Sequence, residues 1–246
     1  MKESIPYRLQ EELQGTIHYE ECERAIISAL ESVYGNNEVP ATNPVIARQR
    51  SFADKEEQVW RHWFQGSPQI QAEIDGKRFV FFDHRLPKPE NLDDFPLLNP
   101  VYLRDHWSQL KNSALSVPRA YLDLLVDLSR AGSDSGVWSV SHSDIGRINC
   151  SMDLQAEEGE PYFSAFLGVT PEERRAYSNK YRVVKGDYFG LYFSLNDANQ
   201  DEARGRVSVF GDHYHGIEGA RFFGVRRRWA SAASHSAEGA TQRSAD

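Results

Sequence analysis

Residues 70–82 read IQAEIDGKRFVFF, and this stretch decides the class of the fold. Its first half alternates apolar and polar residues, which is the period of a half-buried strand. Asp75-Gly76 follows, and a second apolar run leads away from it. Because both residues tolerate the positive φ of a tight turn, the stretch predicts a β-hairpin over 69–82. A lone hairpin is marginal in water, so this one must join a sheet with strands from elsewhere in the chain.

Helical patterns surround the hairpin. Between 19 and 34 the apolar residues recur every three or four positions, and Gly35 ends this predicted helix. A loop with Pro40 and Pro44 separates it from a second predicted helix at 51–66. Further helices are predicted from 100, from 118 to 131 and, as a short helix, from 171, because each has a capping residue or a proline at its start.

The chain after Gly132 is rich in β patterns. Strands are predicted at 148–154, 206–210 and 220–225, and the strongest β pattern covers 181–195 with a turn at Gly186-Asp187. Small and polar residues at 132–136 mark a boundary.

These patterns together predict an α+β fold. A mainly helical N-terminal half with one hairpin covers 1–131, and a β-rich half with an antiparallel sheet covers 137–229. The Ala/Ser/Gly-rich stretch at 230–246 predicts a disordered C-terminal tail. We expect the two halves to pack as one compact unit, because the early hairpin can pair with the later strands.

Composition limits the functional classes. The chain has 246 residues, 40% of them hydrophobic, and a net charge of −8, which argues against bulk electrostatic binding to nucleic acid. Cys22 and Cys150 lack the spacing of a disulfide framework or a zinc finger, as is typical of a reducing compartment. No signal-peptide pattern and no apolar run of about 18 residues occurs. We therefore expect a soluble, cytoplasmic protein with no membrane association.

The sharpest candidate for a metal site is GDHYHGIE at 211–218. Residues two apart on an extended chain project to the same side, so His213 and His215 can present two imidazoles to one point. Asp212 or Glu218 would complete the shell of a divalent metal such as zinc or iron. Glu218 is also a candidate catalytic residue. The alternative is an exposed turn bracketed by two glycines.

Asp83 and His84 form a second candidate catalytic pair. They follow the apolar run at 79–82, and the end of a buried strand is a common place for active-site groups. The alternative is an ordinary strand exit.

Arginines interleave with aromatic residues near the C-terminus. Six of them lie within 204–228: Arg204, Arg206, Arg221, Arg226, Arg227 and Arg228. Alternation along a strand predicts that Arg226 and Arg228 share an open face with Phe222, while Phe223 and Val225 face the core. Arg221, Phe222, Arg226 and Arg228 are therefore the candidate ligand-binding residues, suited to an anion. The alternative is a solvated strand end.

No P-loop, dinucleotide fingerprint, nucleophile elbow or paired metal motif occurs in the chain. We therefore rank first an intracellular interaction or regulatory protein that recognises a protein partner or a small anionic ligand through its arginine-rich and aromatic β face. One alternative is a metal-dependent hydrolase or oxygenase at 213–215. The other is a single-stranded nucleic-acid binder or nuclease that uses the arginines. Whether the protein is an enzyme stays open at this point.

Overall fold

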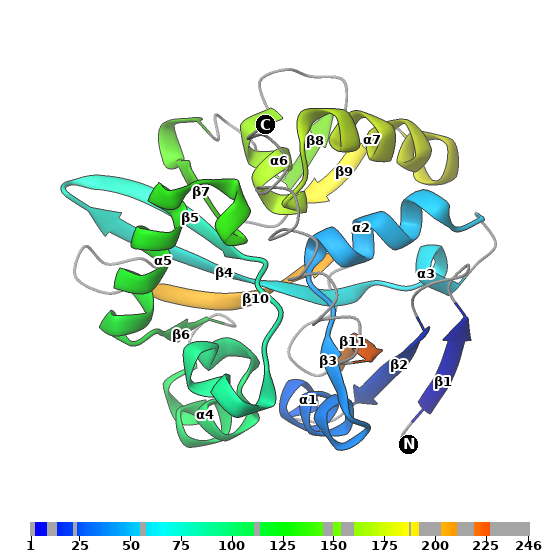
Figure 1. Cartoon of the computed structure of the whole chain (residues 1–246), viewed down its shortest axis with the longest axis horizontal. Coiled ribbons are helices and arrows are strands. Elements are labelled where there is room, and N and C mark those ends of the chain that lie inside the picture. Colours follow the sequence, from blue (N-terminus) through cyan, green and yellow to red (C-terminus); the bar gives the residue numbers. More distant parts are fainter. Residues whose placement is uncertain are drawn as a thin grey trace, which may run out of the picture.

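The computed structural model describes residues 3–8, 14–21, 24–54, 58–110, 114–144, 150–153, 160–186, 188–191, 203–210 and 219–226. The fold is α+β, as the sequence predicts, with helices on both sides of a large sheet (Figure 1). The helices are α1 (Ala25–Gly35), α2 (Asn43–Phe52), α3 (Gln58–Arg61), α4 (Pro100–Asp105), α5 (Arg119–Ala131), α6 (Glu160–Leu167) and α7 (Pro171–Lys185). Short 3-10 turns are η1 (Pro89–Asp94), η2 (Pro96–Leu98), η3 (Trp107–Gln109), η4 (Ser133–Ser135) and η5 (His142–Asp144).

Strands from both halves of the chain build one nine-stranded sheet. Its strands are β1 (Glu3–Arg8), β2 (Gln14–Glu21), β3 (Glu38–Pro40), β4 (Phe64–Ile74), β5 (Lys77–Asp83), β6 (Leu115–Ser116), β7 (Val137–Ser141), β10 (Arg204–Phe210) and β11 (Gly219–Arg226). The main path is β1-β2-β11-β4-β10-β6, with β3 on β11, and β5 and β7 continuing from β4. The described pairings in this sheet are antiparallel except for one parallel bridge between Phe222 and Gln65. A separate pair joins β8 (Cys150–Asp153) to β9 (Tyr188–Leu191).

The predicted hairpin is confirmed as β4 and β5. Ile74 pairs with Lys77, and the turn residues Asp75 and Gly76 have φ of 51° and 73°. Positive φ at both central residues matches the right-handed twist of the strands that they join. Strand β10 pairs with β4, so a strand from the second half of the chain joins the sheet that the hairpin needs.

Two apolar cores lie on opposite faces of the sheet. On β5, Val80 and Phe82 belong to the core beneath α2, α3, α6 and α7, whereas Phe81 belongs to the core beneath α1, α4 and α5. This alternation is the two-residue period of a strand that is buried on both faces. In Figure 1, α2, α6 and α7 lie above the sheet, and α1 and α4 lie below it.

Two predicted helices begin or end in the wrong place. The helix expected at 19–34 begins at Ala25, because the preceding residues form β2, which hydrogen-bonds to β1 and β11. The helix expected at 51–66 is found only as the short helix α3, because α2 starts in the supposed proline loop, with a proline in its first turn, and ends at Phe52. The chain becomes strand at Phe64. Pro68 is tolerated in β4 because its partner strand shifts register just beyond Val207.

The β segment predicted at 181–195 is also wrong over its first five residues. Helix α7 continues to Lys185, because Tyr177 and Tyr181 pack against the ring of Trp60. Its start is as predicted: Thr170 and Glu173 form the capping box. The starts of α4 and α5, and strands β10 and β11, are confirmed. The predicted tail at 230–246 lies outside the described residues. Within those residues, no helix is long and apolar enough to cross a membrane.

Candidate functional site

Asp83, at the end of β5, lies in a buried ion pair. Its side chain is 0% exposed, and Arg85 donates to both of its carboxylate oxygens over 2.8 Å. The hydroxyl of Tyr121, on α5, adds a third side-chain bond over 2.9 Å. Burial lowers the pKa of Arg85, but the hydrogen bond and the charge of Asp83 outweigh this, so the net shift is upward. Burial and Asp83 raise the pKa of Tyr121 well above its usual range, so this hydroxyl keeps its proton and donates.

His84, the next residue, belongs to a different network. Its Nε2 donates to the carbonyl of Ala165 at 2.7 Å, and its Nδ1 lies 2.6 Å from the hydroxyl of Ser67. Since a carbonyl only accepts, Nε2 carries the ring proton, and Nδ1 of the neutral ring accepts from Ser67. The Ser67 oxygen in turn accepts from the backbone N–H of Asn43. Burial lowers the pKa of His84 from 6.5 to about 4, although the Ala165 hydrogen bond opposes the shift.

Asp83 and His84 therefore do not converge on one point. Successive residues of a strand project to opposite faces, so Asp83 contacts α5 and His84 contacts the end of α6. The described partners already bond both carboxylate oxygens and both ring nitrogens. These contacts join the sheet to the helices on either side of it.

The sequence reasoning missed a third buried network. His18 of β2 is 1% exposed, and its Nε2 lies 2.7 Å from the carboxylate of Glu38 on β3. Its Nδ1 lies 3.1 Å from the hydroxyl of Ser32 on α1, and Thr16 donates to the other Glu38 oxygen. The four residues come from three elements, so no local spacing could have revealed them. They anchor α1 to the sheet.

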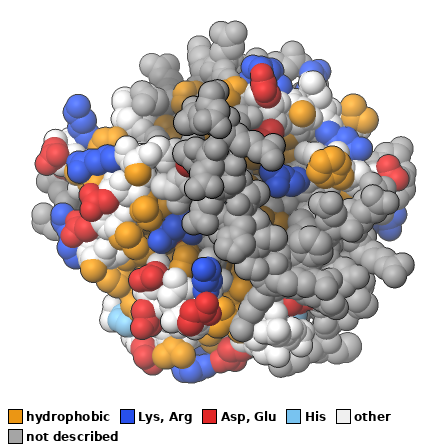
Figure 2. Space-filling view, in the orientation of Figure 1, with side chains coloured by type: hydrophobic (Ala, Val, Ile, Leu, Met, Phe, Trp, Pro, Cys, Tyr) orange, Lys and Arg blue, Asp and Glu red, His pale blue; other side chains and the backbone are white. Residues whose placement is uncertain are grey.

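The arginines that cluster in the sequence are divided in the fold. Arg204 and Arg206 belong to β10, whereas Arg221 and Arg226 belong to β11, and β4 lies between these two strands. Two strand spacings separate β10 from β11, about 10 Å. Figure 2 shows basic and acidic side chains interspersed over the described part of its face.

The predicted position of Phe222 is wrong. It is 0% exposed and belongs to the core beneath α1, so it does not share an open face with the arginines. Phe222 lies opposite Gln65 at the bridge between β11 and β4. Arg227 and Arg228 lie outside the described residues.

The candidate metal ligands Asp212, His213 and His215, with Glu218, also lie outside the described residues. Within the described part of the chain, no group of three or more His, Cys, Asp or Glu residues is placed to hold a metal.

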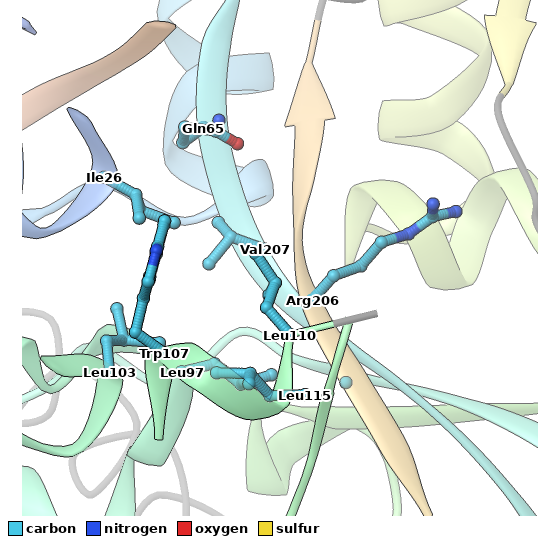
Figure 3. A pocket seen from close by; sticks show the side chains of 10 residues that line it. Ile26, Gln65, Leu97, Leu103, Trp107, Leu110, Leu115, Arg206 and Val207 are labelled. Carbon is cyan, nitrogen blue, oxygen red and sulfur yellow. The ribbon is translucent and has the colours of Figure 1, made fainter. Parts of the chain in front are cut away.

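A small cavity opens beside β4 and β10. Its volume is about 50 Å³, and its wall comes from α1, β4, η2, α4, η3, β6 and β10. Most of the wall is apolar, with Leu97, Leu103 and Leu115 at one end (Figure 3). Gln65 lies at the other end; it is 8% exposed, and its Oε1 has no hydrogen-bond partner among the described residues.

Arg206 lines the cavity only with the base of its side chain. In Figure 3 the guanidinium extends away from the other lining side chains. Burial raises the pKa of Tyr162 on α6 well above its usual range, and the charge of Arg206 partly opposes that shift. The guanidinium thus acts on the opposite face of the sheet. The wall of the cavity is mostly apolar, and Gln65 is the lining residue whose Oε1 is buried without a partner among the described residues.

Comparison with known proteins gives the fold. No family model matches the sequence, and no curated protein matches it. A solved structure described as "Accommodation of massive sequence variation in Nanoarchaeota by the C-type lectin fold" superimposes with a TM-score of 0.72. It is 22% identical, and the match covers 89% of this chain and 100% of that chain. The present chain therefore has the C-type lectin fold.

Proposed function

We propose that this protein is a binding protein, which recognises a protein partner or a small ligand around β4 and β10. The observation that carries the proposal is the mostly apolar cavity, which Gln65 lines; the Oε1 of this residue is buried without a partner among the described residues. An apolar pocket with a few polar groups is the usual form of a small-ligand site. By contrast, Asp83 and His84 have their polar atoms bonded within the protein.

The fold supports recognition as well. The similar structure is described as accommodating massive sequence variation by the C-type lectin fold. In the present chain, two cores on opposite faces of the sheet hold the described fold together. Substitutions outside those cores usually change stability little, so surface residues can specialise for a partner.

A screen of small molecules tests the proposal. Ligand-observed NMR with anionic, aromatic and aliphatic fragments should give binders that lose affinity in Leu110→Trp, because Leu110 is half-buried in the cavity wall and a larger ring would occupy the space. An unchanged melting midpoint would establish that the variant is folded. The proposal fails if no fragment of any class binds the wild-type chain.

The finer hypothesis is that the partner is anionic and meets Arg221, Arg226 and Arg228. Replacing Arg226 and Arg228 together with Glu should abolish binding of poly-L-glutamate in low salt, where an electrostatic contact is strongest. The matched control makes the same charge change at Arg119 and Arg130, which are exposed on α5. Equal binding by the two double variants would contradict the anionic hypothesis.

The metal-dependent alternative stays a prediction. Elemental analysis of the purified protein would detect zinc or iron, and either metal should be lost in His213→Ala or His215→Ala because each imidazole is a ligand in that hypothesis. Metal that survives the double substitution would dispose of the site. For the nucleic-acid alternative, the ultraviolet absorbance ratio of the purified protein reports any nucleic acid that copurifies.

A further inference from the structure

We infer that the cavity takes a short branched aliphatic group that carries one hydrogen-bond donor, and that the donor bonds to the Oε1 of Gln65. The inference rests on the proposed function and names the ligand class for that site. An amino- or hydroxyl-bearing isobutyl group of a small molecule has this chemistry.

The size of the cavity sets the size of the group. Its volume of about 50 Å³ is several times the space that one water needs, about 10–15 Å³. Pockets for drug-sized ligands are much larger, about 300–1,000 Å³. Only a few non-hydrogen atoms can therefore enter, and the rest of a larger ligand would stay outside.

The apolar side chains of the wall favour an aliphatic group. Leu97, Leu103 and Leu115 close one end, and Val207 contributes from the strand beneath. Trp107 and Leu110 are only half-buried, so they lie where the cavity meets the surface. A water held in a cavity needs two to four polar partners, and the side chains of this wall offer few. An alkyl group replaces such water at little loss of hydrogen bonding.

Gln65 supplies the polar requirement. A buried carbonyl without a partner is costly, so a ligand that donates to it gains relative to one that does not. The residue is also held firmly: it pairs with Val209 on β10 and with Phe222 on β11, so β4 is bound on both sides at this point. Little conformational freedom remains to be lost on binding, which favours a preformed acceptor.

Two matched probes test the inference on the unmodified chain. Isobutyl alcohol can donate to Gln65, whereas its methyl ether has the same branched chain and no donor. Titration of ¹⁵N-labelled protein, followed at the Gln65 amide and the Trp107 indole, should give a dissociation constant on the order of millimolar for the alcohol. The ether should bind about tenfold more weakly, because it buries the carbonyl without a partner.

Two variants test whether Gln65 is the acceptor that distinguishes the alcohol from the ether. Gln65→Met keeps the length of the side chain and removes the acceptor, so the preference for the alcohol should vanish. Gln71→Met, on the same strand but outside the cavity, should keep that preference. Should Gln65→Met fail to fold, the comparison of the two probes on the wild-type chain still decides the question.

Each outcome is informative. Equal binding of alcohol and ether would overturn the donor requirement but leave the binding function intact. Tighter binding of the ether would mean that its additional methyl group, and not a donor, is recognised, which also overturns the inference. If other fragments bind and neither isobutyl probe does, the ligand class is wrong. The absence of any binder removes the proposed function itself.

Discussion

Lowering the pH from about 7.5 to about 4.5 should reduce the free energy of unfolding through protonation of His84. The loss should be larger than a solvent-exposed histidine would cause. The ring is neutral in the fold, where Nε2 donates to Ala165 and Nδ1 accepts from Ser67. Its pKa falls from 6.5 to about 4 because burial penalises the charged form. The unfolded chain, whose histidines are solvated, therefore binds the proton first as the pH falls.

The magnitude follows from the two pKa values. The His84 contribution is fully present above about pH 6.5, falls as the pH drops and levels off near pH 4, where the folded ring protonates as well. Between about pH 7.5 and about pH 4.5 the free energy of unfolding should drop by about 2.5 kcal/mol from this residue alone. That is a large share of the stability of a typical domain, about 5–15 kcal/mol.

The assay compares the wild type with His84→Gln. A glutamine can donate to the Ala165 carbonyl and accept from Ser67, but it does not titrate. Urea unfolding at several pH values gives the free energy of unfolding of each protein, and all other titrating groups cancel in the difference between the two slopes. The wild type should lose about 2.5 kcal/mol more than the variant over this range. Parallel slopes would refute the buried, neutral histidine.

Three further predictions concern stability. Gly168→Ala should lower the free energy of unfolding by about 2–4 kcal/mol, because φ is +62° and the new Cβ would overlap with the buried ring of His84. Gly35→Ala, where the new Cβ meets nothing within 4 Å, should be nearly neutral when both variants are compared by chemical denaturation. Arg85→Met should cost about 3–5 kcal/mol because it leaves the carboxylate of Asp83 buried without its cation; a loss under 1 kcal/mol would contradict the ion pair. Deleting residues 230–246, which composition predicts to be disordered, should leave the melting midpoint unchanged; a drop of several degrees would show that they contribute to the fold.

The candidate sites show which features of a site local residue patterns can predict. Asp83 and His84 lie at the end of a buried strand, where the sequence placed them, but their partners Tyr121 and Ala165 lie 38 and 81 residues away in the chain. No pattern in the sequence predicted the cavity, because seven elements form its wall. Gln65 itself fell inside a stretch that the sequence predicted to be helical.

Elements that depend on near neighbours were determined by the sequence itself. The hairpin at Asp75-Gly76 needs only two residues that accept positive φ, and the caps at Asn99 and Thr170 bond to backbone within three residues. Such interactions are the same in a short peptide as in the fold, so a local pattern predicts them.

In segments with mixed preferences, only the tertiary structure decided between helix and strand. Residues 181–185 carry a β pattern, yet they are helical because Tyr177 and Tyr181 pack on Trp60, more than 100 residues earlier. Residues 19–21 carry a helical spacing, yet they pair with β1 and β11 as part of a strand. Packing against distant partners contributes more free energy than the intrinsic preference of a few residues, which is small for either state. The burial of Phe222 and the lack of a described partner for the Oε1 of Gln65 likewise depend on segments far away in the chain.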